Sequence, residues 1–276
     1  MTERIALVTG ATNGVGRVVA KRLAGKGWLV LVHGRDQARG RQVVRDIEAD
    51  GGQARFYAAD LASNDGVRGL AEAVAKDHPR LPLLVSNAGI GFGAPGAGRE
   101  VSPDGYELRF AVNYLAPFLL TRLLLPNVLA AAPARIVNVA SIGQQDLDFE
   151  DLQSSRRYSG VDAYRRSKLA LIMLTLDLAE ELKDRKVTVN ALHPATFMDT
   201  FMVHEAGAAP MSTVDEGAAA IMNLAVSDRM SGRTGEYFDG LSPSRARAQA
   251  YDKQSRARLR QISFDLTGAP EAASAA

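Results

Sequence analysis

The chain of 276 residues is 46% hydrophobic, which is enough to bury one large α/β core. Its formal net charge of +2, from 33 basic and 31 acidic residues, leaves no surplus of positive charge for binding nucleic acid. Cysteine is absent and the four histidines lack metal-binding spacing. This excludes disulfides and thiolate catalysis, and it predicts no metal site.

The first residues show no pattern of a targeting segment. An apolar run begins almost at once, at residues 5–8, with no charged segment followed by an apolar one. The longest apolar stretch, residues 115–132, contains Arg122, Pro117 and Pro126, so it is a poor membrane span. We therefore expect a soluble, cytoplasmic protein that binds neither membrane nor nucleic acid.

A glycine-rich turn follows the first expected strand, residues 4–9. The turn reads TGATNGVG and leads into a helix with apolar periodicity. Glycines have no Cβ, so backbone amides at a helix N-terminus can approach a phosphate. The segment predicts a nucleotide site, with an ordinary turn as the alternative. The residues expected to bind the cofactor here are Gly10, Asn13, Gly14, Val15 and Gly16.

The second expected strand, residues 28–32, is followed closely by Arg35. In dinucleotide-binding folds an acid at this place bonds the ribose 2′-hydroxyl, whereas an arginine pairs with a 2′-phosphate. Arg35 therefore favours NADP(H) over NAD(H). Asp36 opposes this preference unless it caps the helix expected at residues 37–49.

Strands and helices continue to alternate through the middle of the chain. The elements expected here are strands at residues 54–58 and 83–86 and helices at residues 64–77 and 103–132. Asn87 follows a strand, where it would lie on the binding edge of a parallel sheet. The glycine-rich loop at residues 91–98 is expected to border the substrate. Asn113 lies in an apolar part of its helix and needs partners there, either as a structural brace or in a functional role.

A serine, a tyrosine and a lysine in the next segment could form a proton-transfer site. Ser141 follows a strand, and a polar loop at residues 144–160 should lie near the reacting centre. On the helix expected at residues 161–182, Tyr164 and Lys168 are four residues apart and share a face. A nearby ammonium lowers the pKa of a phenol. The alternatives are a turn serine, a surface tyrosine and a solvated lysine.

The last third of the chain adds a strand at residues 187–192, a helix at 214–226 and a strand at 236–238. The apolar segment at residues 196–210 is expected to cover a substrate pocket, with surface packing as the alternative. Its expected substrate contacts are Phe197, Met198 and Phe201. The arginine-rich helix after residue 242 is interpreted as a solvated face, and residues 268–276 are expected to be disordered.

The whole pattern predicts an α/β fold: a single-domain, Rossmann-type, doubly wound parallel sheet with helices on both faces, spanning residues 1–267. The helix at residues 161–182 is apolar on more than one side. One side can face the sheet and another a second copy of the chain, so we expect a homodimer or homotetramer.

Together these motifs resemble those of the short-chain dehydrogenase/reductase family. The set is Thr9-Gly10-xxx-Gly14-x-Gly16, Asn87-Ala88-Gly89, Asn113, Ser141 and Tyr164-xxx-Lys168, in that order and across nearly the whole chain. The phrases DFEDLQ, YRRSKLA and LHP, with Tyr237 and Phe238, look like the retinol dehydrogenase and WW-domain oxidoreductase branch. Membrane-bound members of that branch carry an N-terminal anchor, which is not expected here.

The resemblance implies a role for each matched residue. Tyr164 would be the general acid/base and Lys168 the cation that lowers its pKa and holds the nicotinamide ribose. Ser141 would orient the substrate carbonyl, and Asn113 would hold a water that links Lys168 to solvent. Ser141 and Tyr164 would also contact the substrate. The implied cofactor contacts are Asp60, Leu61, Asn87, Ala88, Gly89, Tyr164, Lys168, Pro194, Thr196 and Thr200.

One departure from the family concerns the loop after Pro194. The family commonly has glycine after this proline, where the chain has Ala195. Thr200 and Thr196 therefore both remain candidates for the cofactor contact, with Thr200 favoured.

The implied activity is NADP(H)-dependent transfer of a hydride between nicotinamide and a ketone or secondary alcohol with an apolar body. A catalytically silent cofactor-binding regulatory or interaction protein is the first alternative. Epimerisation or dehydration through a transient ketone is the second. Asn113, Ser141, Tyr164 and Lys168 together favour the enzyme, because a binding module has no need of all four.

Overall fold

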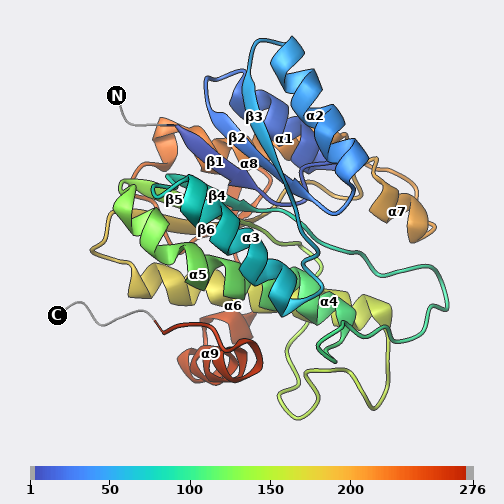
Figure 1. Ribbon diagram of the computed structural model, residues 1–276. Coiled ribbons are helices and arrows are strands. Elements are labelled where there is room, and N and C mark those ends of the chain that lie inside the picture. The colour runs from blue at the N-terminus through green and yellow to red at the C-terminus, as the bar shows by residue number, and fades with distance from the viewer. Residues whose placement is uncertain (1–3, 272–276) are drawn as a thin grey trace.

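The computed structural model describes residues 4–271, and one eight-stranded sheet runs through this part of the chain (Figure 1). The strands are β1 (Ile5–Val8), β2 (Leu29–Gly34), β3 (Gln53–Ala58), β4 (Leu83–Ser86), β5 (Ala134–Val139), β6 (Val187–His193), β7 (Tyr237–Asp239) and β8 (Ser242–Ser244). Their order across the sheet is β3-β2-β1-β4-β5-β6-β7-β8. Neighbours are parallel from β3 to β7.

The last strand departs from the predicted parallel sheet. β8 pairs with β7 in antiparallel register, with Tyr237 opposite Ser244. Its three residues are exposed and polar or proline, so no apolar alternation marks them as a strand in the sequence. The doubly wound sheet is confirmed, with the correction that it is mixed rather than wholly parallel.

Helices lie on both faces of the sheet (Figure 1). They are α1 (Gly14–Ala24), α2 (Gln37–Ala49), α3 (Asn64–Asp77), α4 (Leu108–Phe110), the π-helical η1 (Ala111–Leu115), α5 (Ala116–Ala130), α6 (Gly160–Glu181), α7 (Phe201–Glu205), α8 (Val214–Val226), α9 (Lys253–Thr267) and the 3-10 turns η2 (Asp228–Met230) and η3 (Ala248–Tyr251). α1, α2 and α8 bury Val19, Ile47 and Ile221 in one apolar cluster. α3, α5 and α6 contribute to a second cluster. Strands between two such layers are buried on both sides and read as continuous apolar runs.

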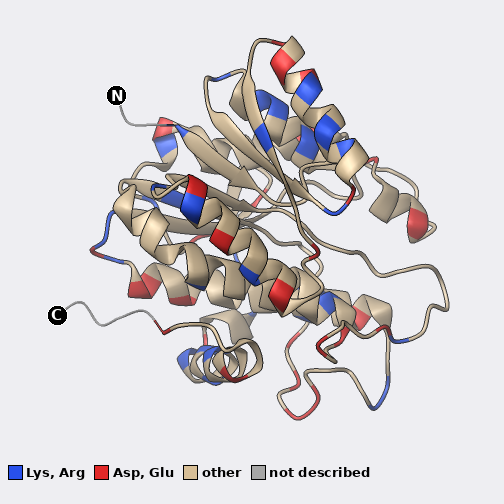
Figure 2. Ribbon diagram, viewed as in Figure 1, with Lys and Arg blue, Asp and Glu red and all other residues tan. Residues whose placement is uncertain are grey.

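Local capping signals set the starts of two helices at the predicted residues. Asp36 accepts a hydrogen bond from the Arg39 amide at 3.0 Å, and α2 begins directly after it. Thr213 and Glu216 form a reciprocal capping box at the start of α8. Figure 2 shows acidic and basic residues interspersed along α2 and α3, in keeping with the small net charge.

The helix predicted at residues 103–132 begins later than expected. Residues 103–107 form turns, and Glu107 caps α4 by accepting the Phe110 amide at 2.7 Å. The helix then passes through the π turn η1 before Pro117, which lies in the first turn of α5. A π turn inside an α-helix is rare and frequently marks a functional site. This one carries Asn113.

Among the described residues, one continuous helix, Leu108–Ala130, has the length and hydropathy of a membrane span. In its most apolar window, 89% of the residues are buried inside the protein. It is therefore the central helix of a packed core, and its apolar composition is explained by burial.

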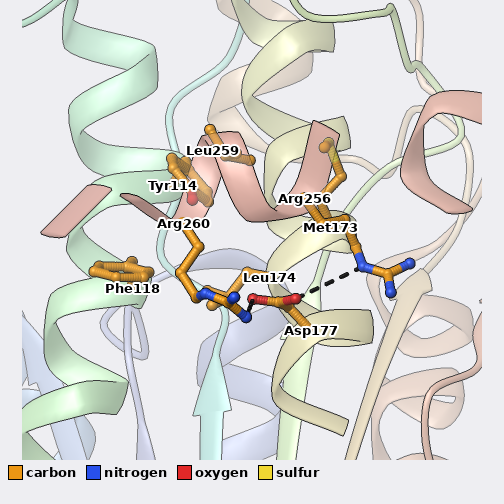
Figure 3. A pocket seen from close by; sticks show the side chains of 8 residues that line it. All are labelled: Tyr114, Phe118, Met173, Leu174, Asp177, Arg256, Leu259 and Arg260. Atoms are coloured by element: carbon orange, nitrogen blue, oxygen red, sulfur yellow. Dashed lines mark hydrogen bonds and ion pairs between the residues drawn. The ribbon is translucent and has the colours of Figure 1, made fainter. Parts of the chain in front are cut away.

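The C-terminal helix α9 packs against α6, and Figure 3 shows Leu259 of α9, Leu174 of α6 and Tyr114 of η1 lining one pocket. Arg256 and Arg260 reach Asp177 on α6, with nitrogen to oxygen distances of 3.7 and 2.8 Å. Arg256 is only 5% exposed. The interpretation of the arginines as a solvated face is therefore wrong for Arg256.

This docking accounts for part of the second apolar side of α6 within the chain. The predicted homodimer or homotetramer stays a prediction. At the end of the chain, Arg68 donates hydrogen bonds to the carbonyls of Thr267 and Gly268, so the predicted disordered tail begins in an ordered contact. Residues 272–276 of that predicted tail lie outside the described residues.

Candidate active site

The four predicted catalytic side chains are brought together at the carboxyl edge of the sheet. Ser141 follows β5, Tyr164 and Lys168 lie on α6, and Asn113 lies on η1. All four are buried, with exposures of 7%, 8%, 4% and 0%. The Lys168 ammonium is 5.7 Å from the centroid of the Tyr164 ring. The alternatives of a surface tyrosine and a solvated lysine are wrong, while the catalytic roles stay predictions.

Ser141 is held so that its hydroxyl faces the phenol. Its Oγ accepts a hydrogen bond from the Gly143 amide at 3.0 Å. Its backbone carbonyl accepts one from the Tyr237 hydroxyl, also at 3.0 Å. The Ser141 hydroxyl lies near enough to the Tyr164 phenol to lower its pKa. One hydrogen bond to the Ser141 side chain and one to its backbone carbonyl thus hold the residue beside Tyr164.

Burial raises the pKa of the Tyr164 phenol, and the hydrogen bond from Ser141 opposes that rise. The net direction is the reverse of the one expected from Lys168, whose ammonium would lower this pKa. The reason is the depth of the phenol in the protein, because burial penalises the charged phenolate. At neutral pH Tyr164 is therefore a protonated hydroxyl.

Lys168 is oriented by the backbone of β5. Its Nζ donates a hydrogen bond to the Val139 carbonyl at 2.9 Å. Burial lowers the pKa of the ammonium to about 8. Most of the Lys168 population is still charged at neutral pH and can stabilise negative charge near Tyr164.

Asn113 acts as a brace between the segment after β4 and α6. Its amide nitrogen donates to the Ile90 carbonyl and to Ser167 Oγ, each at 3.0 Å, and its Oδ1 accepts the Ile90 amide at 2.8 Å. A Cβ at Gly89 would lie 3.2 Å from Asn113 Oδ1 and 3.4 Å from Lys168 Nζ. Both polar groups therefore border Gly89, and the water relay through Asn113 stays a prediction.

The glycine turn lies where the strand order reverses, between β1 and β4. The Asn87 side chain donates to the carbonyls of Thr9 and Gly10 at 2.8 and 3.2 Å. Thr9 Oγ1 accepts the amides of Asn87 and Ala88 at 2.9 and 3.0 Å. These bonds join the ends of the two strands at the crevice where such sheets bind ligands.

The turn fits a phosphate group. Asn13 caps α1 by accepting the Gly14 amide at 2.8 Å. The amides of Val15 and Gly16 come next at the helix N-terminus, where helix geometry gives them no carbonyl partner within the helix. A Cβ at Gly16 would collide with Asn87 Nδ2 and the Gly10 carbonyl, so this position requires glycine.

His33 is a structural member of this site that sequence analysis did not single out. It is 2% exposed, and its Nδ1 accepts the Gly10 amide at 3.3 Å. Its Nε2 faces the Ala59 carbonyl at 3.2 Å. Burial lowers the pKa of His33 to about 4. The neutral ring thus ties the glycine turn to the end of β3, next to Asp60.

Arg35 and Asp60 lie together at the outer end of the crevice, with 3.9 Å between Nη1 and Oδ1. Both side chains are more than half exposed, at 69% and 52%. Asp36 is engaged elsewhere, because it caps α2 and pairs with Arg39 at 3.0 Å. The Arg35 guanidinium is therefore exposed to an approaching anion, while Asp36 is already held as a helix cap.

The loop after Pro194 separates the two threonine candidates. Thr200 lies over the glycine turn, since a Cβ at Gly14 would be 3.3 Å from the Thr200 methyl. Thr196 Oγ1 is bonded instead to His193 Nε2 at 3.1 Å. The structure thus places Thr200 beside the glycine turn, and its contact with the cofactor stays a prediction.

The predicted substrate contacts of this loop do not share one surface. Met198 packs against Val15 and Gly217, between α1 and α8, and its substrate contact stays a prediction. Phe201 is 68% exposed and Phe197 37% exposed. Their substrate roles stay predictions. Met202 contacts Gly91, which brings α7 beside the loop at residues 91–98.

Sequence analysis missed one aromatic residue at the reacting centre. Phe92, on the glycine-rich loop, packs edge to face against Tyr164, with 4.7 Å between ring centroids and planes at 86°. The loop was expected near the substrate, but neither its composition nor its spacing pointed to Phe92.

Comparison with known proteins gives a consistent result. Residues 4–210 match the family model of short chain dehydrogenases. The chain is 31% identical to human retinol dehydrogenase 12, over 96% of this chain and 86% of that protein. It is 34% identical to mouse retinol dehydrogenase 13, over 95% and 83%.

Solved structures extend the likeness to the fold. An uncharacterized protein from Mycobacterium Paratuberculosis superimposes with a TM-score of 0.80 and 28% identity, covering 97% of this chain and 94% of that one. A metagenomic short-chain oxidoreductase in complex with NADP gives a TM-score of 0.64 and 30% identity, covering 86% and 94%. The sheet order, the buried Ser141, Tyr164 and Lys168, and these matches show that the chain belongs to the short-chain dehydrogenase/reductase family, in its retinol dehydrogenase branch, and is an oxidoreductase acting on alcohols.

Proposed function

We propose that the protein is an NADP(H)-dependent oxidoreductase that interconverts a ketone and a secondary alcohol on an apolar small molecule. The observation that carries the proposal is the buried Tyr164 phenol, with the Ser141 hydroxyl and the Lys168 ammonium beside it. A buried hydroxyl pair beside a cation is suited to a reaction in which charge develops on a carbonyl oxygen.

Tyr164, Ser141 and Lys168 have different roles at the carbonyl oxygen of the substrate. When bound, the nicotinamide cofactor supplies or accepts the hydride. Tyr164 donates its proton to the carbonyl oxygen, and the Ser141 hydroxyl orients the same oxygen. Lys168 stabilises the negative charge that the phenol acquires, at a site where the low exposure of all three groups strengthens electrostatic interactions.

The protonation state of Tyr164 suits carbonyl reduction. Because burial raises the pKa of the phenol, the hydroxyl keeps its proton at neutral pH and is ready to give it away. Alcohol oxidation needs the reverse transfer and is favoured as pH rises. The protonated state of Tyr164 at neutral pH therefore supports carbonyl reduction as the favoured direction.

The preference for NADP(H) rests on Arg35. Its exposed guanidinium can pair with a ribose 2′-phosphate, while Asp36 is occupied as a helix cap. The solved relative in complex with NADP supports the same choice. The residues that would hold the cofactor are the glycine turn with Asn13, Val15 and Gly16, together with Arg35, Asp60, Leu61, Asn87, Ala88, Gly89, Lys168, Pro194 and Thr200.

An apolar substrate is supported by the surroundings of the reacting groups. Phe92 packs on Tyr164, and Ile142, directly after Ser141, is 55% exposed. The relatives are named for retinol, which is an apolar alcohol. We place the reaction in the cytoplasm, on a free small molecule, with no nucleic-acid or membrane partner.

The test is NADPH and NADH oxidation by the purified protein against a panel of apolar ketones, aldehydes and quinones. The proposal expects turnover with at least one apolar ketone and faster turnover with NADPH. Tight NADPH binding without turnover of any panel member would instead support a catalytically silent cofactor-binding protein. Faster turnover with NADH would contradict the role given to Arg35.

A further inference from the structure

A buried guanidinium lies beneath the loop that carries Phe92. Arg109, on α4, is 2% exposed. Its Nε donates to the Gly91 carbonyl at 2.9 Å and its Nη2 to the Phe92 carbonyl at 3.0 Å. Burying an arginine is costly unless its donors are paired, and two of these pairings are to the loop backbone. The loop at residues 91–98 is therefore fixed at its first two residues.

The other side of the same guanidinium engages a second loop. Arg109 Nη1 donates to the Tyr158 hydroxyl at 2.6 Å and lies 3.4 Å from Glu107 Oε1. The Tyr158 hydroxyl donates to the same Glu107 oxygen at 3.2 Å. Glu107 also caps α4, which continues into η1 and Asn113. Arg109 therefore connects the loops at residues 91–98 and 144–160 to the helix that carries Asn113.

The loop at residues 91–98 packs closely against the Arg109 guanidinium. A Cβ at Gly93 would be 2.6 Å from Arg109 Nη2, so the chain passes the guanidinium where only a glycine fits. A Cβ at Gly160, the first residue of α6, would collide with the Phe92 carbonyl. The Phe92 backbone is thus held between Arg109 and the start of α6.

This backbone clamp sets the position of one aromatic ring. The Phe92 ring meets the Tyr164 ring edge to face at 4.7 Å, a favoured arrangement for aromatic pairs. The contacts run without a gap from Arg109 to the Phe92 backbone, to the Phe92 ring and to the phenol of the proposed proton donor.

We propose that Arg109 is a positioning residue for the reaction, which holds the Phe92 ring against Tyr164 and thereby fixes an apolar wall of the substrate site and keeps water from the phenol. The inference rests on the proposed role of Tyr164. Such a wall favours substrates that place an apolar body beside the reacting carbonyl, because a polar group there would lose hydrogen bonds to water without replacement.

The inference can be tested with Arg109→Lys and Phe92→Leu, with Arg157→Lys as the matched control. Lysine keeps the positive charge but not the forked donors that hold two carbonyls. Leucine removes the ring and leaves the clamp. Arg157 is exposed on the loop beside Tyr158. Each variant is assayed in the reductive direction for kcat, KM and the pH profile of kcat/KM, and for NADPH affinity by binding.

We expect both test variants to lose about 10- to 100-fold in kcat, as reacting groups lose their alignment. NADPH affinity and the control variant should match the wild type. The titratable groups that interact with Tyr164 and Lys168 include Tyr237 on β7 and His193 on β6. Water admitted by a loosened Phe92 raises the pKa of Lys168, where the alkaline decline begins, so both variants should move that decline to higher pH.

The inference is overturned if both variants fold and keep the wild-type kcat and pH profile. If Arg109→Lys does not fold, an unchanged pH profile in Phe92→Leu overturns it alone. A Tyr164→Phe variant run beside them separates the two proposals. Full turnover by Tyr164→Phe refutes the proposed function, whereas its inactivity together with an unchanged Phe92→Leu refutes only the role of Arg109.

Discussion

The cofactor side and the substrate side of this active site are built in different ways. On the cofactor side, neighbouring strand ends are joined by short contacts to backbone atoms, such as those of Thr9 and Asn87. On the substrate side, long loops are held by a few buried side chains, of which Arg109 makes the most bonds to loop residues. We therefore expect the strand ends to determine cofactor binding, and a few contacts between residues far apart in the chain to determine substrate choice.

The largest effect is expected where the two sides meet, at Tyr164. Tyr164→Phe removes the proposed proton donor and leaves the ring packed against Phe92, so kcat should fall by about 10² to 10⁴-fold with little change in stability. Tyr57→Phe is the control, because the Tyr57 hydroxyl bonds Asp77 away from the site. The measurement is kcat of both variants by steady-state kinetics. Equal kcat values would rule out Tyr164 as the proton donor.

A substitution on the cofactor side should weaken NADPH binding more than it lowers kcat. Gly16→Ala places a Cβ against Asn87 Nδ2 and the Gly10 carbonyl, which should cost about 1–3 kcal/mol of stability and weaken NADPH binding. Gly69→Ala is the matched control, since a Cβ there meets nothing within 4 Å on the exposed side of α3. Denaturant unfolding and NADPH titration are the measurements. A Gly16→Ala protein as stable as Gly69→Ala would show that the turn is not tightly packed.

Acid should loosen the cofactor side through His33. The folded protein holds the pKa of His33 at about 4, against 6.5 in the unfolded chain. The unfolded state therefore takes up a proton first, and stability present above pH 6.5 is lost as pH falls toward 4, by about 2 kcal/mol between pH 7 and pH 5. His33→Gln should lack this part of the pH dependence. Urea unfolding at the two pH values tests it, and parallel losses in both proteins would contradict it.

The smallest effect is expected at the exposed end of the crevice. Arg35→Ala should raise KM for NADPH about tenfold and leave KM for NADH unchanged, because only NADPH carries the 2′-phosphate. Kinetics with both cofactors at a fixed substrate concentration gives the ratio. Equal changes in KM for NADPH and NADH would mean that Arg35 does not bind the 2′-phosphate.

The same contrast explains how much of the site could be predicted from the sequence. The strand ends, the glycine turn and the start of α2 at Asp36 depend on residues close together in the chain, and they could be predicted. The role of Arg109 could not, because its loop partners Gly91, Phe92 and Tyr158 lie 17 to 49 residues away and the sequence around Arg109 gives no sign of them. The direction of the Tyr164 pKa shift was also missed, since burial depth is a property of the folded chain. The packing of Met198 between α1 and α8 escaped prediction for the same reason.

The most direct test of the central claim is the pH dependence of carbonyl reduction by the wild type and Tyr164→Phe. The account predicts a wild-type kcat/KM that is level through neutral pH, where the buried phenol keeps its proton, and that declines on the alkaline side, beginning near the Lys168 pKa of about 8. Tyr164→Phe should be slow at every pH. A wild-type rate that rises with pH, or a Tyr164→Phe variant with the wild-type rate and profile, would contradict Tyr164 as the buried proton donor.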